Sequence, residues 1–182
     1  MRMQRGIEEL PFERIRRLQR DGDVTSLIAE LSNPASFGPI GVRGWAARAL
    51  GKLGDPRAIE PLARLLKEDS SELVRSTAAR SLGQIGDSRA VPDLLAALDD
   101  ESDLVRTWAS DSLGRLGAFN TASKVTELLT SPSRMVRQAA AVALGRIGNS
   151  STIGALARAA SEEGWWHGRL HRRAIRRIRS RS

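Results

Sequence analysis

The sequence predicts an all-α fold, an α-solenoid in which short helix pairs stack into one continuous array. The first observation is an internal repeat, because a segment that begins with Val-Arg recurs at intervals of 32, 31 and 31 residues, at Val42, Val74, Val105 and Val136. The second is composition: the 182 residues include sixteen Gly but few aromatic residues, with four Trp, three Phe and no Tyr. The core must therefore be filled by Ala, Leu, Ile and Val, and stacking repeats bury such residues continuously.

The Val-Arg segment of each copy is predicted to be a helix. In the first copy its apolar residues lie at i, i+4, i+7, i+8 and i+11, which is one face of an α-helix: Val42, Ala46, Ala49, Leu50 and Leu53. A Gly follows the last apolar residue in every copy, and we expect it to end the helix in the left-handed conformation. These glycines are Gly54, Gly86, Gly117 and Gly148.

A second helix is predicted after each of these glycines. Asp55 and Pro56 suit the N-cap and first position of a helix, and apolar residues follow at Ile59, Leu62 and Leu65. One such pair cannot bury its apolar stripe alone, so neighbouring pairs must stack.

The whole chain, residues 1–182, is predicted to form a single repeat domain. We expect an N-terminal cap helix in 1–22, repeats in 23–54, 55–86, 87–117 and 118–148, and a partial repeat with an Arg-rich cap in 149–182. In the cap, His171 and Arg172 take the place of an Ala-Ala pair, which predicts an end that accepts no further repeat.

The motif Val-Arg-x-x-Ala-Ala-x-Ala-Leu-Gly-x-Ile/Leu-Gly-Asp resembles the HEAT-like repeat named after the phycobilisome bilin lyases. The resemblance covers about residues 23–160. It implies a right-handed superhelix of HEAT-like helix pairs, with the Val-Arg helix lining the concave face. It implies no single function, because this repeat occurs in scaffolds, adaptors, lyase subunits and enzyme appendages.

The positions of the Val-Arg helix that vary between copies are the candidate binding residues, because structural positions repeat and these do not. They form three rows on one side of the helices. The candidate partner-binding residues are Trp45, Thr77 and Trp108, then Arg48, Arg80 and Asp111, then Lys52, Gln84, Arg115 and Arg146. Exposed Trp beside Arg is typical of interaction hot spots; the alternative is that each Trp only covers a groove between repeats.

Residues that recur in the copies are interpreted as structural. Arg43, Arg75, Arg106 and Arg137 are expected to form hydrogen bonds between neighbouring turns, together with Asp55 and Asp87. Ala118 and Asn149 replace the Asp in later repeats, so we expect weaker bonding there. The loop 32–41 is longer than its counterparts and contains Phe37, which either reaches over the binding surface or reflects tolerated variation.

The formal net charge of +8 is concentrated at the C-terminus. From Gly168 onward there are Arg residues and no acids, so residues 1–167 have a net charge of only +1. The candidate anion-binding residues of this segment are Arg169, Arg172, Arg173, Arg176 and Arg177. These residues would bind nucleic acid or an acidic partner, and a membrane surface is less favoured. The structural alternative is a cap whose outer face is solvated.

The sequence shows no catalytic constellation and implies no cofactor. The absence of Cys excludes thiolate zinc sites and cysteine nucleophiles. His167 and His171 share a helix face but have no evident third ligand, so no metal site is predicted. Apolar runs are too short to span a membrane and no secretory signal is visible, so we expect a cytoplasmic protein.

These observations favour a non-catalytic scaffold or adaptor that binds a protein or peptide on its concave face through Trp and Arg/Lys side chains. Two alternatives remain: a nucleic-acid-binding protein that uses the basic row and the C-terminal Arg residues, and a lyase-type subunit related to the bilin lyases.

Overall fold

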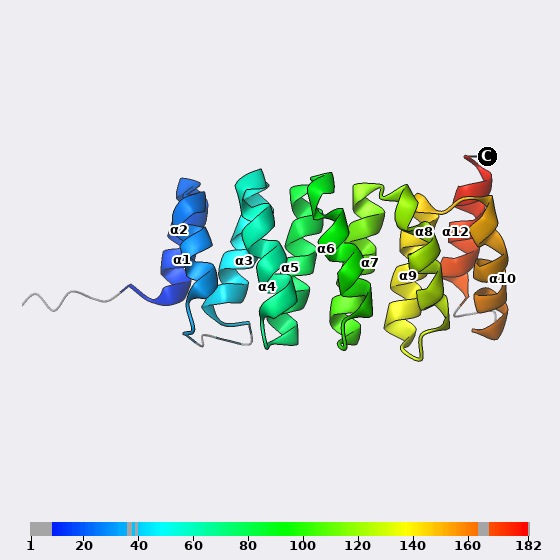
Figure 1. Cartoon of the computed structure of the whole chain (residues 1–182), viewed down its shortest axis with the longest axis horizontal. Coiled ribbons are helices and arrows are strands. Elements are labelled where there is room, and N and C mark those ends of the chain that lie inside the picture. The colour runs from blue at the N-terminus through cyan, green and yellow to red at the C-terminus, as the bar shows by residue number, and fades with distance from the viewer. Residues whose placement is uncertain (1–8, 36–37, 39, 164–167, 182) are drawn as a thin grey trace, which may run out of the picture.

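The computed structural model describes residues 9–35, 38, 40–163 and 168–181, and within these the ordered elements are α-helices and short 3₁₀ turns. The helices stand side by side in two layers that form one elongated array (Figure 1). The predicted all-α solenoid is therefore confirmed.

The first layer, here called the long-helix layer, contains the Val-Arg helices. Each of its helices packs against the next. In chain order they are α1 (Pro11–Asp21), α3 (Gly41–Leu53), α5 (Glu72–Ile85), α7 (Asp103–Leu116), α9 (Arg134–Ile147) and α12 (Arg169–Arg179).

The second layer, here called the short-helix layer, lies in front of the first in Figure 1. Its helices are α2 (Val24–Ala29), α4 (Ile59–Glu68), α6 (Val91–Ala96), α8 (Ala122–Glu127) and α10 (Ile153–Glu162). A 3₁₀ turn precedes α4, α6, α8 and α10, such as Pro56–Ala58 before α4.

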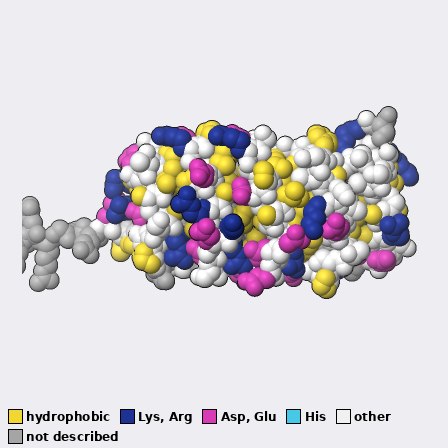
Figure 2. Space-filling view, in the orientation of Figure 1, with side chains coloured by type: hydrophobic (Ala, Val, Ile, Leu, Met, Phe, Trp, Pro, Cys, Tyr) yellow, Lys and Arg dark blue, Asp and Glu magenta, His cyan; other side chains and the backbone are white. Residues whose placement is uncertain are grey.

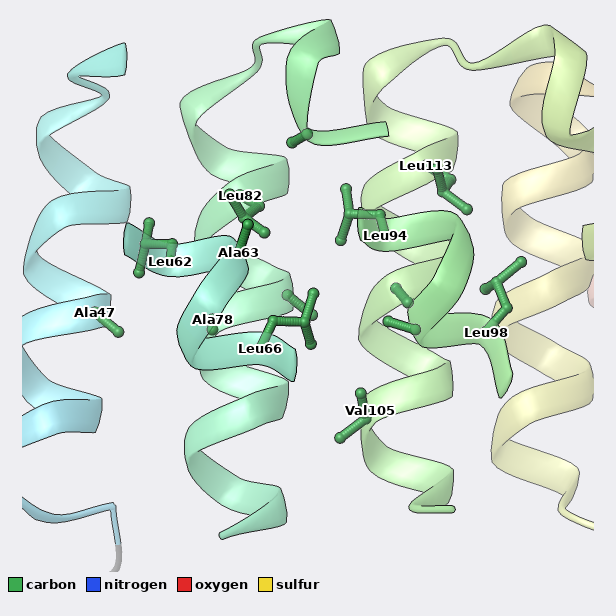
Figure 3. Packing of buried hydrophobic residues seen from close by; sticks show 14 of the residues in the cluster. Ala47, Leu62, Ala63, Leu66, Ala78, Leu82, Leu94, Leu98, Val105 and Leu113 are labelled. Atoms are coloured by element: carbon green, nitrogen blue, oxygen red, sulfur yellow. The ribbon is translucent and has the colours of Figure 1, made fainter. Parts of the chain in front are cut away.

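The core between the layers consists of Ala, Leu, Val and Ile side chains, as the composition requires. Leu62 and Leu66 of α4 point toward the long helices. Leu94 of α6 and Leu98 of the 3₁₀ turn Ala97–Asp99 do the same one repeat later (Figure 3). This repeating Leu pattern carries the core along the array without a central aromatic cluster.

Close contact between long helices depends on one of the two repeated glycines. A Cβ atom on Gly114 of α7 would lie 2.9 Å from the Cα atom of Ala143 in α9. Gly145 faces Ala174 of α12 in the same way, with a corresponding distance of 3.2 Å. This position therefore sets how closely the helices pack, which the sequence alone did not assign to it.

The other repeated glycine follows the last residue of the long helix, and in three of four copies it has the predicted left-handed conformation. Gly54, Gly86 and Gly117 have φ values of 70°, 83° and 65°, in the left-handed region. The prediction is wrong for Gly148, whose φ of −70° and ψ of 160° are extended. There a side chain is excluded by contacts instead, because its Cβ atom would lie 2.7 Å from Oγ1 of Thr152.

The repeated Arg residues bind the turns between helices, which confirms their structural interpretation. Arg75 is buried and donates to both carboxylate oxygens of Asp100 at 2.9 Å and to the backbone carbonyl of Asp69 at 2.9 Å. Arg43 donates to Asp69 at 2.7 Å, one repeat earlier. Arg106 and Arg137 bind turn carbonyls in their own repeats.

The interpretation of Asp55 and Asp87 as bonds between neighbouring turns is wrong. Each caps its own 3₁₀ turn by accepting from the backbone N–H two residues later, at 2.9 Å, and pairs with the Arg at that position. Asn149 keeps this backbone bond at 3.0 Å, whereas Ala118 has no side-chain cap.

The C-terminal end differs from the prediction in one residue. His171 does not lie on the outer surface, because its side chain is fully buried against Glu163 of the preceding segment. Arg176 of α12 occupies the position that corresponds to Gly145 of α9, and it is exposed. A side chain of this size prevents the close packing that the glycines allow between neighbouring long helices.

Candidate functional site

The variable positions of the long helices form one continuous surface, here called the basic face. It includes all ten candidate residues, on α3, α5, α7 and α9. The same spacing extends the rows at both ends, to Glu13, Arg16 and Arg20 of α1 and to Leu170, Arg173 and Arg177 of α12. Sequence reasoning missed the contribution of α1, although its residues lie 32 positions before Trp45, Arg48 and Lys52.

At its N-terminal end the basic face contains a groove of about 680 Å³ between α1 and α3. Its aromatic floor is formed by Phe12 and Trp45, whose ring centroids lie 5.1 Å apart in an edge-to-face arrangement. The Arg48 guanidinium lies 5.6 Å from the Trp45 ring, and that of Arg16 lies 5.5 Å from the Phe12 ring. The groove therefore combines an apolar floor with cationic walls.

The two candidate Trp residues are not the exposed anchors that the sequence suggested. Both are half-buried and pack against the core. The Nε1 atom of Trp45 is buried and has no hydrogen-bond acceptor among the described residues. The alternative prediction, that each Trp covers a groove between repeats, fits this packing better. Replacing either by Ala would remove core contacts as well as binding surface.

Trp108 of α7 is covered by Arg80 of α5, whose guanidinium lies 4.6 Å from the ring centroid. This contact joins two neighbouring long helices across the face. It leaves the Arg80 charge at the surface without a carboxylate partner among the described residues. Thr77, between the two Trp positions, donates instead to the backbone carbonyl of Leu73 at 2.7 Å.

An ion pair between α7 and α9 lies on the face next to its C-terminal end. Arg146 of α9 donates to Asp111 of α7 at 2.7 Å, and the two side chains are 32% and 26% exposed. The neighbouring face positions of α9 are the apolar Ala139 and Val142. The pair is neutral as a whole, so it adds no net charge to the face.

At the C-terminal end a smaller groove, of about 170 Å³, lies between α9 and α12. Val142, Gly145 and Leu170 contribute apolar lining, and Arg146, Arg173 and Arg177 border it. Of the other C-terminal candidates, Arg169 and Arg176 are exposed on α12 away from these rows, and Arg172 is half-buried.

Most cations of the basic face lack an acidic neighbour. Within the described part of the chain, no ion pair with a carboxylate is formed by Arg48, Lys52, Arg80, Arg115, Arg173 or Arg177. The face thus has a strong excess of positive charge even though residues 1–167 are nearly neutral as a whole. Unpaired cations on one surface attract anionic partners over long range.

The opposite surface has a different character. Figure 2, which views the short-helix layer, shows Lys and Arg interspersed with Asp and Glu. A groove of about 610 Å³ between α8 and α10 is lined mainly by small and polar residues, with Arg158 near Glu127 and Glu162. This mixture gives no preference for one charge.

Two sequence-based expectations lie outside the described residues, namely those on Phe37 and His167. Among the residues that the structure does describe, no group of three His, Cys, Asp or Glu side chains is placed to hold a metal ion. None of the described helices has the length and apolar character needed to cross a bilayer.

Comparison with known sequences decides the family. A profile of HEAT repeats matches residues 25–114 and 105–176, which together span most of the chain. The chain belongs to the HEAT repeat family. No curated protein sequence matches it.

Several solved HEAT and armadillo structures are similar to this HEAT repeat protein. The complex of CpcE and CpcF of phycocyanin lyase from Nostoc sp. PCC7120 contains a chain with 25% identity and a TM-score of 0.67, covering 92% of this chain and 71% of that one. A designed armadillo repeat protein in complex with the peptide (KR)4 has 21% identity and a TM-score of 0.64, covering 93% and 87%. Human deoxyhypusine hydroxylase in complex with glycerol has 20% identity and a TM-score of 0.55, covering 94% and 78%.

Proposed function

We propose that this HEAT repeat protein is a non-catalytic scaffold that binds an acidic segment of a protein partner along its basic face. The observation that carries this proposal is the set of unpaired cations, from Arg48 and Lys52 on α3 to Arg173 and Arg177 on α12. An acidic segment would supply the missing carboxylates, and half-buried aromatic side chains beside them favour a partner with apolar residues. The similar chain of phycocyanin lyase comes from a complex of two proteins, which supports a protein partner.

Nucleic acid is the second candidate, because the same cations would also attract phosphates. Two observations favour protein. The Trp108 ring is covered by Arg80 and Trp45 is packed against Phe12, so neither offers an open face on which a base would stack. In addition, the Asp111 carboxylate lies on the face, where a peptide can place an uncharged residue but a phosphate backbone, charged at every nucleotide, cannot.

The lyase-type alternative is supported by the similarity to phycocyanin lyase. It predicts that the purified protein carries, or binds on addition, a bilin with visible absorbance. Colourless protein whose absorbance spectrum is unchanged by added bilin would argue against it.

Fluorescence anisotropy tests the proposal with a labelled peptide rich in Glu and Asp that also contains Leu and Phe. We expect binding that weakens as NaCl is raised. The triple variant Arg48→Glu/Arg115→Glu/Arg173→Glu should weaken binding about tenfold or more. The matched control Arg64→Glu/Lys67→Glu/Arg158→Glu makes the same charge change at exposed positions of α4 and α10 and should change affinity less than about twofold.

Equal losses in the two triple variants would contradict a defined binding face. Tighter binding of single-stranded or duplex DNA than of the peptide, lost in the first variant only, would support the nucleic-acid function instead. Far-ultraviolet circular dichroism of both variants checks that the helices are intact.

A further inference from the structure

We propose that the basic face binds its partner at two separate anion sites, one at each end, and that the partner segment therefore carries two acidic clusters separated by roughly 10–12 residues. This inference rests on the proposed function and specifies the kind of acidic segment that the face fits.

The first anion site is the groove between α1 and α3. Arg16, Arg20, Arg48 and Lys52 line it, against the single carboxylate of Glu13. The volume of about 680 Å³ and the aromatic floor provide room for an apolar side chain next to the acidic ones. An acidic cluster that contains a large apolar residue would fit here.

The second anion site is the groove between α9 and α12. Arg173 and Arg177 have no acidic partner among the described residues, and both border this groove. Its volume of about 170 Å³ suits one small side chain, so we expect carboxylates with little apolar bulk at this end.

The surface between the two sites offers an acidic cluster less than the two grooves do. Arg146, which borders the second groove, already pairs with Asp111. Arg80 lies over the Trp108 ring, and Arg115 is a separate exposed cation on α7. A mostly uncharged linker between the two clusters is therefore sufficient here.

The distance between the sites follows from helix packing. The long helices stand in a nearly straight row (Figure 1), and four helix-to-helix steps separate the α1/α3 groove from the α9/α12 groove. Packed helices lie 8–10 Å apart, so the sites are about 32–40 Å apart. An extended chain rises about 3.3 Å per residue, which gives the linker of roughly 10–12 residues.

The test uses the full chain and labelled peptides of equal total length, each with two Glu/Asp tetrads joined by a Gly/Ser linker. One peptide has a linker of about 12 residues, one has a linker of about 3, and a third has a single tetrad. We expect the long-linker peptide to bind about tenfold or more tighter than the single-tetrad peptide, because its second cluster binds intramolecularly. The short-linker peptide should lose this gain.

Variants at the two ends locate the sites. Arg48→Glu/Lys52→Glu and Arg173→Glu/Arg177→Glu should each reduce the long-linker peptide to the affinity of the single tetrad. The control Arg64→Glu/Lys67→Glu, on α4, should leave the linker dependence unchanged.

Equal affinity of the long-linker and short-linker peptides, with both lost in the variants, would overturn the two-site inference while leaving the acidic-partner function intact. No binding of any acidic peptide at low salt would overturn both. Loss of binding in the α4 control to the same extent would also overturn the inference, because attraction would then not depend on position.

Discussion

At the scale of single residues, buried polar side chains such as Arg75 bind turns that recur with the repeat. His171 is buried without such a partner among the described residues. Arg75 has several partners within hydrogen-bonding distance. His171 is fully buried, and its nearest carboxylate oxygen, on Glu163, lies 3.6 Å from Nδ1, too far for a good hydrogen bond. Glu163 already accepts from Arg137 at 2.8 Å.

The buried imidazole predicts a pH-dependent stability. Burial lowers the pKa of His171, and the opposing attraction of Glu163 is offset in part by the nearby charges of Arg137 and Arg172. The unfolded chain then takes up a proton near pH 6.5 that the folded chain does not. Stability is therefore fully present above that pH and declines as the pH falls below it toward the lowered pKa of the folded state. Chemical denaturation of His171→Leu should show a flatter profile over this range.

His167 is the only other histidine, so His167→Gln is the matched control. It should keep the pH dependence of the parent protein. An unchanged profile in the His171 variant would show that another group is responsible.

Removing a buried Arg of the turn network should be costly. Arg75→Met removes both guanidinium bonds to the Asp100 carboxylate, which keeps the backbone N–H of Ser102, and the bond to the Asp69 carbonyl. We expect the free energy of unfolding to fall by about 3 kcal/mol. Arg57→Met removes an exposed pair with Asp55 and should change stability little. Urea denaturation of both variants measures the difference, and similar losses would contradict the structural role of Arg75.

At the scale of helices, the repeat spacing was enough to predict each long helix and its neighbours. The functions of individual positions were harder to predict. Two glycines recur in every copy, yet one allows close helix packing and the other ends a helix. The sequence shows that both glycines recur in every copy. It does not show which contact requires each of them, because those contacts are made between repeats.

This distinction predicts opposite effects of two Gly→Ala changes. Gly114→Ala places a methyl group 2.9 Å from the Cα atom of Ala143, so we expect destabilisation of about 1–3 kcal/mol. A Cβ atom on Gly154 of α10 would lie 3.8 Å from Nη1 of Arg158, an ordinary van der Waals contact with a flexible side chain, and the residue is helical. Gly154→Ala should therefore stabilise by about 0.5 kcal/mol. Thermal unfolding followed by circular dichroism measures both, and two shifts of the same sign would contradict this assignment.

At the scale of the whole molecule, the candidate surface could be predicted in part. Variable positions on a repeating helix identified the rows of Arg48 and Lys52 without any structure. The pairing of Arg146 with Asp111 and the covering of Trp108 by Arg80 could not be predicted, since each joins residues in neighbouring helices. The low net charge of residues 1–167 also hid the positive charge of the basic face, because it averages over two layers of different charge.

The position of Arg176 has a consequence for growth of the array. Every earlier junction between the Val-Arg helices uses a glycine at this point, from Gly51 to Gly145, so successive helices join by nearly identical, open-ended contacts. Subunits joined in that way elongate into filaments unless an end is blocked. An exposed guanidinium stands at this point of α12, so we expect no second copy of the chain to dock on α12 through the contact that joins the long helices within one chain.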